Sequence, residues 1–297
     1  MPEPVTAQGH GESSEGHVSL RTTLLRASQL PLLPGVLGEG LSPLEIVGSL
    51  GSPVAHAGPV ASFLEVRLLP GRETSPLPAQ GNESILMVLE GTLSHHDLGR
   101  GSTDRLQAGD VLRLRDGPGA ERKESNEGDV PAHFLQISLP LRSPSAARKD
   151  LVRAAQVPTR SFPGGISFRC LAGEGSPLDL GYPDLTLERW SLDPETVVAY
   201  AMEPGEGLLL WAEAGRFTLD SPGPPRLGPF GIATGDSLLV ESAARERVRL
   251  LSHAPDAGRD RSPGHYLLAR FNVTRHQMDE GTSSSVLTHA PRPTSAG

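Results

Sequence analysis

The sequence contains a single cysteine, Cys170, among 297 residues. One thiol cannot form an internal disulfide, and it has no partner cysteine for a zinc ribbon. Basic residues are also in deficit, with 27 Lys and Arg against 35 Asp and Glu, and lysine occurs only at Lys123 and Lys149. The net charge of -8 offers no basic stripe for phosphate groups, so we do not expect nucleic acid as a direct partner.

Long apolar runs are missing as well. The longest, such as residues 208–212, fall far short of the ~20 residues that cross a bilayer as a helix. The first residues, MPEPVTAQGHGESSEG, are polar and acidic, unlike a signal peptide. We therefore expect a cytoplasmic protein with neither a membrane span nor a membrane partner.

Turn-forming residues are abundant, with 34 Gly and 28 Pro. They separate short apolar runs in which apolar and polar residues alternate, as in VLRLR at 111–115 and RVRL at 247–250, and this pattern predicts an all-β fold. Residues 1–17 and 275–297 have few large apolar side chains, so we expect disordered tails.

One segment departs from the strand pattern. Ser143 and Pro144 precede SAARKDLVRAA, and a serine cap, a proline at the first helical position and alanine-rich sequence together predict a short helix. On either side the chain repeats the order strand, glycine turn, strand, Gly-Asp turn, strand, with glycine turns at Gly91 and Gly215 and Gly-Asp turns at 109–110 and 235–236. This is a weak internal repeat.

The repeated turns carry a resemblance to a known family. VLEGTLSHHD followed by LQAGDVLRL resembles the first cupin of pirin and its quercetinase-like bicupin relatives, and LTLERWSL with GLLLWAEAGRFTL and GIATGDSLLVES resembles their second cupin. The resemblance implies a bicupin, two jelly-roll β-barrels in one chain joined by a short helix. It divides the chain into a first cupin at 18–140, a connector at 141–165 and a second cupin at 166–274.

The resemblance also implies a metal site in the first cupin. There a His-x-His pair and a later His-x-Glu pair hold iron or a similar divalent ion, because alternate residues of a strand share one face. Aligned on the glycine turns, the four ligand positions fall on Leu77, Ala79, Arg122 and Glu124, and only the glutamate is retained. Leucine and alanine donate no electron pair and arginine has no acceptor, so we expect no metal cofactor unless ligands have been rebuilt elsewhere.

His95 and His96 are adjacent, and adjacent residues of a strand point to opposite faces. They make a poor chelate, so we interpret them as turn or surface histidines. Arg122 and Glu124 share a face and form a hypothetical ion pair in place of the metal, unless both point to solvent in a charged loop. We expect His133 to lie in the protein core, on a buried strand.

Three functional hypotheses remain. In the first, the protein is a non-catalytic module that binds a small molecule or a protein, with a regulatory role that the resemblance implies, because pirin is a cofactor of transcription regulators. In the second, it is a metal-dependent dioxygenase of the quercetinase type with rebuilt ligands. In the third, it is a metal-free enzyme that uses Glu83, Glu124 or His133 as acid or base, with Arg122 in the same pocket. The missing ligands count against the second hypothesis, and of the three we expect a binding module rather than an oxygenase.

Overall fold

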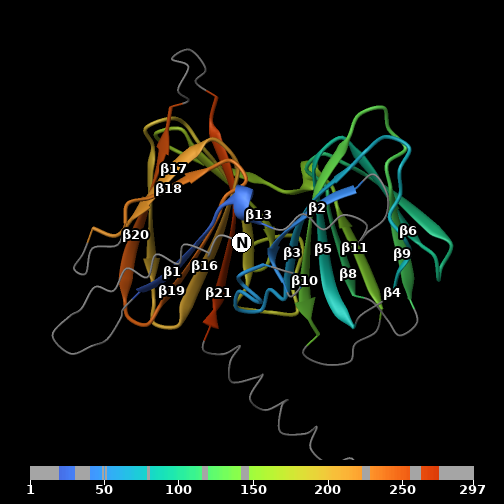
Figure 1. Ribbon diagram of the computed structural model, residues 1–297, viewed down its shortest axis with the longest axis horizontal. Coiled ribbons are helices and arrows are strands. Elements are labelled where there is room, and N and C mark those ends of the chain that lie inside the picture. Colours follow the sequence, from blue (N-terminus) through green and yellow to red (C-terminus); the bar gives the residue numbers. More distant parts are fainter. Residues whose placement is uncertain are drawn as a thin grey trace, which may run out of the picture.

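The computed structural model describes residues 20–30, 41–48, 50, 52–78, 81–115, 120–141, 147–222, 228–254 and 262–273. Both predicted tails, residues 1–17 and 275–297, lie outside these ranges. The described chain is almost entirely β-structure, as the alternation predicted. It forms two similar halves that lie side by side (Figure 1). No helical segment among the described residues is long and apolar enough to cross a bilayer.

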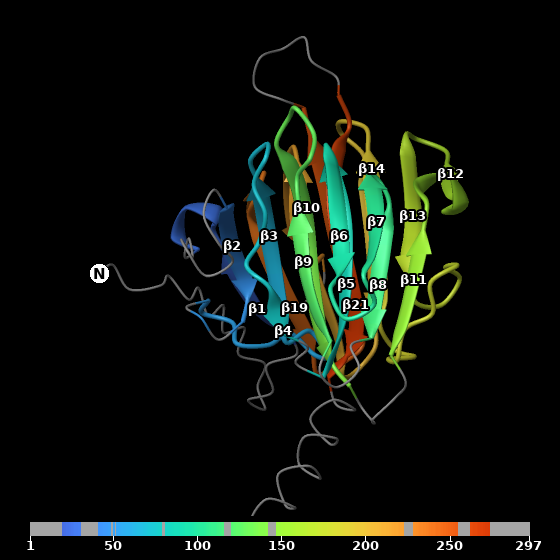
Figure 2. The same cartoon turned by 90° about the vertical axis from the view of Figure 1, so that its right-hand side faces the viewer.

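Each half contains a large inner sheet and a small outer sheet, and we call each pair of sheets a barrel. In the first barrel the inner sheet has six strands, in the order β11 (Arg148–Val152), β8 (Val111–Arg115), β5 (Asn82–Glu90), β10 (Ala132–Pro140), β3 (Ser62–Leu68) and β2 (Leu41–Val47). The outer sheet has the order β4 (Leu77–Pro78), β9 (Glu121–Ser125), β6 (Thr92–Asp97) and β7 (Ser102–Gln107). Figure 2 shows β6, β7 and β9 in front of the inner strands.

The second barrel repeats this arrangement. Its inner sheet has the order β1 (Leu20–Leu25), β19 (Ser237–Ser242), β16 (Glu206–Ala214), β21 (Gly264–Asn272), β14 (Thr186–Leu192), β13 (Ile166–Ala172) and β12 (Thr159–Phe162). Its outer sheet has the order β15 (Val197–Met202), β20 (Glu246–His253), β17 (Arg216–Asp220) and β18 (Phe230–Ala233). The weak internal repeat in the sequence therefore corresponds to two equivalent barrels.

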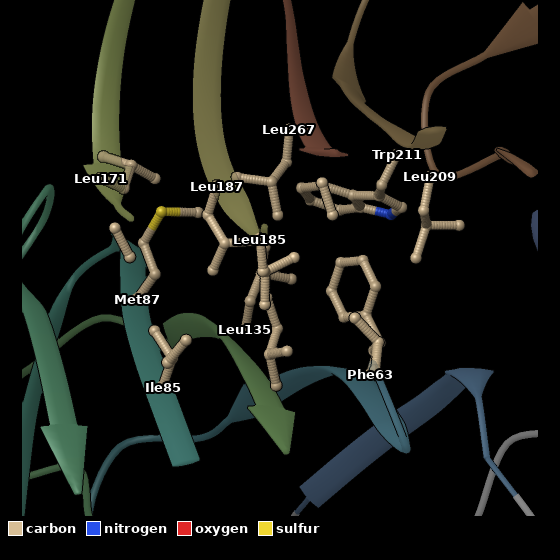
Figure 3. Close-up of a cluster of buried hydrophobic side chains, with 14 of the residues drawn as sticks. Phe63, Ile85, Met87, Leu135, Leu171, Leu185, Leu187, Leu209, Trp211 and Leu267 are labelled. Carbon is tan, nitrogen blue, oxygen red and sulfur yellow. The ribbon is translucent and has the colours of Figure 1, made fainter. Parts of the chain in front are cut away.

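Each barrel has its own apolar core. Leu93 and Leu106 of the first outer sheet pack with Leu86, Leu112 and the other inward-facing residues of the inner sheet. A third core lies between the barrels, where the two inner sheets pack face to face (Figure 3). Burial of apolar side chains there joins the two halves into one body.

The predicted connecting helix is wrong. Residues 142–146 lie outside the described ranges, but Arg148–Val152 forms β11, which pairs antiparallel with β8, and only Ala154–Gln156 forms a single 3₁₀ turn (η2). Strand pairing with a distant segment outweighs the helix propensity of the alanines, because propensity is a weak prior against tertiary contacts.

Two strands lie across the predicted domain boundaries. The first cupin was assigned residues 18–140, yet β1 pairs with β19 in the second barrel. The predicted connector, in turn, supplies β11 to the first barrel and β12 to the second. Each barrel thus receives an edge strand from the segment that precedes the other barrel, and β1 and β11 occupy equivalent places beside β19 and β8.

The exchanged strand β1 ends in a short clasp. The sequence LLRASQL at 24–30 contains a 3₁₀ turn, η1 (Ala27–Gln29). Nη1 of Arg26 donates to Oδ2 of Asp236 at 2.7 Å, and the Ala27 amide donates to Oδ1 at 2.9 Å. Asp236 belongs to the Gly-Asp turn before β19, so the clasp fixes the end of β1 to the second barrel.

The same contacts follow β11. In LVRAAQV at 151–157, Nη1 of Arg153 donates to Oδ2 of Asp110 at 2.7 Å and the Ala154 amide donates to Oδ1 at 2.9 Å. The similarity of the segments 24–30 and 151–157 was a sequence signal that β1 and β11 have equivalent places in the two barrels. The pattern of turns alone did not reveal it. The clasps fix a common register, which allows residues of the two barrels to be compared position by position.

Candidate functional site

The sheet register brings the expected ligand segments of the first barrel together. β4 pairs with β9, so Leu77 lies opposite Arg122 and Pro78 opposite Glu121. Ala79 lies outside the described residues. Two of the positions that the resemblance assigns to a metal, Leu77 and Arg122, therefore meet on adjacent strands of the outer sheet, although neither is a metal ligand.

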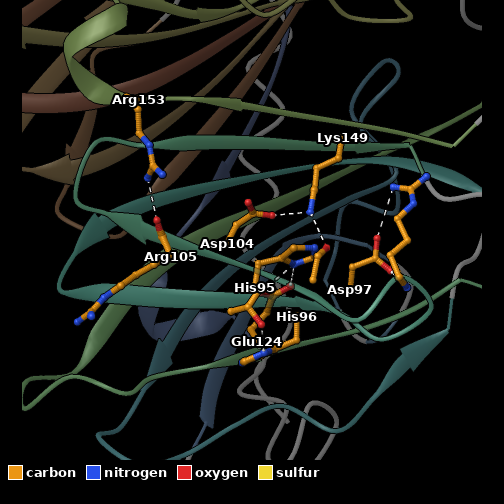
Figure 4. Close-up of polar contacts among 11 residues, drawn as sticks. His95, His96, Asp97, Asp104, Arg105, Glu124, Lys149 and Arg153 are labelled. Atoms are coloured by element: carbon orange, nitrogen blue, oxygen red, sulfur yellow. Dashed lines mark hydrogen bonds and ion pairs between the residues drawn. The ribbon is translucent and has the colours of Figure 1, made fainter.

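Glu124 meets a residue that the sequence analysis set aside. His95 lies directly opposite it on β6, and Nδ1 of His95 lies 3.0 Å and 3.2 Å from the two carboxylate oxygens, so its N–H donates to them (Figure 4). Both side chains are only 1% exposed. The interpretation of His95 as a turn or surface histidine is wrong. Its alternation with buried Leu93 was the signal that it faces the barrel interior.

His96 does point away, as alternation predicted. Its Nδ1 hydrogen bonds with Oγ1 of Thr103 at 2.9 Å, and its Nε2 hydrogen bonds with Oγ of Ser125 at 2.8 Å. The two adjacent histidines thus have separate partners, and they do not form a chelate.

The hypothetical pair of Arg122 and Glu124 takes a different form. Glu124 lies against His95, and its backbone amide donates to Oγ1 of Thr74 at 2.9 Å. Arg122 is partly exposed, and its Nη2 donates to Oγ of Ser84 at 3.0 Å. The alternative in which Glu124 points to solvent is wrong, because the carboxylate is buried.

Ser84 belongs to a group of polar residues on the barrel side of the inner sheet. The cross-strand register aligns Ser84 with Ser138 and Ser138 with Ser62, and Gln136 lies two residues from Ser138 on the same face. We call these four residues, together with Arg122, Glu124 and His95, the polar layer. Gln136 is partly exposed although β10 is a central strand, so solvent reaches the barrel interior at this level.

The second barrel has apolar residues at most of the corresponding positions. By register, Leu219 and Leu250 correspond to His95 and Glu124, because each pair is opposed on equivalent strands. The positions equivalent to Leu77 and Arg122 are Tyr200 and Val248, and Gln136 corresponds to Leu268; all three are buried in the second barrel's core. Ser138 and Ser62 correspond to Arg270 and Thr186, which are also polar. The same architecture thus folds with apolar residues at the positions of His95, Glu124 and Gln136.

Glu83 lies outside the first barrel's interior. It is 0% exposed and faces the second barrel, where it accepts a hydrogen bond from Nε of Arg113 and a 3.1 Å hydrogen bond from the Gly181 amide. Arg113 is equally buried and also contacts Asp150 at 3.2 Å. Glu83 is therefore part of a buried ion-pair network between the barrels.

His133 also faces the space between the barrels. It is buried on β10, its Nε2 lies 2.9 Å from Oε1 of Glu65, and its ring packs edge-on against Trp211 at 6.4 Å between centroids. This agrees with the core position expected from the sequence. Of the four predicted pocket residues, Arg122 and Glu124 lie on β9 of the outer sheet, whereas Glu83 and His133 face the space between the barrels.

Cys170 offers no reactive thiolate. Burial, with a smaller contribution from the charge of Glu188, raises the pKa of its thiol to about 11. A thiol with that pKa is protonated at neutral pH and is a poor nucleophile or metal ligand.

The donor set does not fit a divalent metal. One carboxylate and one imidazole are already hydrogen bonded to each other, and the neighbouring positions hold a leucine and a guanidinium. Transition-metal sites of proteins need three or four electron-pair donors at one point. Within the described ranges, no group of three or more His, Cys, Asp or Glu residues is arranged to hold an ion.

Comparison with known proteins gives a match in structure but not in sequence. No family model matches the chain, and no curated protein matches it. Among solved structures, a protein of Geobacillus kaustophilus matches with a TM-score of 0.68 at 18% identity, covering 86% of this chain and 98% of that one.

Two further solved structures match the chain. The pirin YhhW of Escherichia coli, solved in complex with nickel(II), matches with a TM-score of 0.59 at 18% identity over 79% of this chain and 99% of its own. Quercetin 2,3-dioxygenase of Acinetobacter baumannii matches with a TM-score of 0.66 at 15% identity over 84% of this chain and 86% of its own. The chain therefore has the bicupin fold of pirin and quercetin 2,3-dioxygenase, as the turn motifs predicted.

Proposed function

We propose that this protein is a non-catalytic bicupin that binds a small molecule in its first barrel without a metal ion. The observation that carries the proposal is the state of Glu124, the one retained ligand position. Its carboxylate is buried and accepts a hydrogen bond from His95, so its oxygens already have a partner within the protein.

The chemistry of the remaining positions supports the loss of metal-dependent dioxygenation. Leu77 provides no electron pair, and Arg122 provides a positive charge at the level where a cation would have to bind. A cation beside a guanidinium would be repelled rather than held. We therefore place the quercetinase-type alternative second.

Burial also argues against metal-free acid–base catalysis. A general base has to come within hydrogen-bonding reach of the proton that it removes. His95 and Glu124 expose almost no surface, and Glu83 and His133 are buried between the barrels. None of the four side chains is exposed enough to contact a substrate.

The contrast between the barrels supports binding. The second barrel folds with leucines where the first has Gln136, Ser84 and Glu124, so the fold itself does not require polar residues there. Polar groups inside a protein cost free energy unless they are satisfied, and their presence at a solvent-reached level is typical of ligand sites. Because these residues lie between the two sheets, we favour a small molecule over a protein partner.

The composition supports a cytosolic location for this function and gives no reason to add nucleic acid or a membrane as a partner. The regulatory role that the resemblance implies remains part of the proposal. It would act through the bound small molecule.

An activity assay tests the proposal against its main alternative. We expect no oxygen uptake above the protein-free rate when the purified protein is incubated with quercetin and supplied in turn with Fe²⁺, Mn²⁺ and Ni²⁺. Quercetin dioxygenase from Acinetobacter baumannii, assayed in parallel, is the positive control. Metal-dependent turnover of quercetin by this chain would overturn the proposal.

A further inference from the structure

We propose that the outer edge of strand β12 (Thr159–Phe162) is an interaction surface that pairs with the same strand of a second copy of this chain. The two strands lie antiparallel about a two-fold axis, and the pairing joins the inner sheets of the two second barrels into one continuous sheet. This inference goes beyond the proposed function, because it concerns a surface of the second barrel and needs no ligand.

β12 is an open edge of its sheet. It is the last strand of the second inner sheet, and its only strand partner within the described ranges is β13. All four of its residues are exposed, and Figure 2 shows the strand on the rim of the molecule. Alternate residues of an edge strand point their backbone N–H and C=O groups away from the sheet, where another strand can pair with them. Among the residues that the structure describes, the first inner sheet has no counterpart of β12, so the barrel architecture does not require this strand.

The composition of β12 differs from that of a protected edge. β11, the outermost strand of the first inner sheet, carries three charged residues in succession at 148–150, and charged side chains discourage pairing at an edge. β12 has a single charge, Arg160, beside Phe162, whose side chain is 49% exposed. Pro158 and Pro163 flank the strand and confine any pairing to a short segment.

Phe162 is the outermost ring of an aromatic stack. Its centroid lies 5.9 Å from that of Phe168 at an interplanar angle of 6°, and Phe168 lies 4.6 Å from Trp190. Trp190 stacks on the buried ring of Tyr266 at 6.1 Å, and Cζ of Arg160 lies 5.7 Å from the centroid of Phe168. The stack holds Phe162 and Arg160 in place before a partner arrives, which lowers the entropy cost of association. Aromatic and arginine side chains also contribute most to the binding energy of many interfaces.

The sequence of β12 selects one register. Directly opposed residues of an antiparallel pair share a face, so the two-fold axis has to pass beside a residue. An axis at Arg160 would set two like charges opposite each other, which is destabilising. An axis at Ser161 sets each Arg160 opposite the partner's Phe162, where a guanidinium and an aromatic ring attract each other. An axis at Thr159 or Phe162 would instead leave Arg160 opposite a proline or a glycine.

The charge around the edge suits a second copy. Arg153, Arg160 and Arg169 are the only charged residues between positions 153 and 173, whereas the whole chain has a net charge of -8. A basic segment at the contact offsets part of the repulsion between two acidic chains. Since a two-fold contact uses the β12 edge of both copies, the assembly closes at the dimer.

Sedimentation velocity of the full chain over a range of concentrations tests the proposal. We expect a monomer–dimer equilibrium with a Kd on the order of 10 μM, because the interface is small. F162D should raise this Kd at least about thirtyfold, since it removes an aromatic anchor from both copies. V197D is the matched control: Val197 of β15 is 50% exposed and receives the same charge, and this variant should dimerise as the wild type does.

S161C tests the register. With the axis at Ser161, the two new cysteines would be directly opposed, with Cα atoms about 4.5–5.5 Å apart, within the range that a disulfide spans. Diamide accepts two electrons and two protons from a pair of thiols, and it should link S161C into a covalent dimer on non-reducing electrophoresis. V197C should stay monomeric under the same treatment. Cys170 is buried in both variants, so it does not compete.

Three results would overturn the proposal. They are a wild type that stays monomeric at concentrations far above the expected Kd, an F162D variant that dimerises as the wild type does, and a V197D variant that loses the dimer. Equal cross-linking of S161C and V197C would contradict the register and the edge together. S161C changes an exposed serine, so it keeps the test valid if F162D does not fold.

Discussion

Replacing His95 with leucine should lower the free energy of unfolding by about 3–5 kcal/mol, the cost of leaving a buried charge without its partner. The Glu124 backbone amide would keep its hydrogen bond to Oγ1 of Thr74, but the Glu124 carboxylate would lose the imidazole that it contacts. The buried carboxylate would then lack its side-chain partner, which costs stability. Urea denaturation followed by tryptophan fluorescence measures the change.

The double variant H95L/E124L should recover most of that loss. The equivalent pair of the second barrel is Leu219 and Leu250, so the architecture accepts two leucines at this point. Buried ion pairs are often replaced by apolar residues with little loss or with a gain in stability. A double variant as unstable as H95L would contradict this explanation, because it would show that the pair stabilises the fold by more than its mutual hydrogen bonds.

Replacing Glu83 with alanine should destabilise the protein by a similar amount, about 3–5 kcal/mol. The change removes the buried partner of Arg113 and the acceptor of the Gly181 amide, and Arg113 would retain only Asp150. The loss should appear as a lower midpoint of urea unfolding.

Arg148→Gln provides the comparison for this change. This change breaks the ion pair between Arg148, which is largely exposed, and Asp150, which is partly exposed. Loss of such a pair should cost at most about 1 kcal/mol. If E83A were as mild as R148Q, the network between the barrels would not contribute to holding them together.

The fold was predictable because its signals are local. Alternation within strands and the glycine turns at Gly91 and Gly215 are read from a few neighbouring residues, and their order matched a bicupin. Gly91 needs a positive φ of 74°, and a Cβ there would lie 2.6 Å from the Pro131 carbonyl oxygen, so the turn requires glycine.

Strand exchange was not predictable from the same signals. The segment that forms β11 has the composition of a helix, and what makes it a strand is β8, more than thirty residues earlier in the chain. β1 likewise depends on β19 at the other end of the sequence. Local propensity carries no information about such partners.

The site was predicted in part, for a related reason. Alignment identified Arg122 and Glu124, but the partner of Glu124 became clear only from the register that sets His95 opposite it. Glu83 and His133 were grouped with the pocket because the sequence does not say which face of a strand looks into the barrel and which looks toward the other half. In the structure both look toward the other half.

The metal content of the wild-type protein tests the central claim most directly. Protein purified without chelators and incubated with equimolar Fe²⁺, Mn²⁺ and Ni²⁺ would be desalted and measured by elemental analysis. The occupied carboxylate of Glu124 and the charge of Arg122 predict far less than one transition-metal ion per chain. A stoichiometric ion that is lost in E124Q would contradict the account.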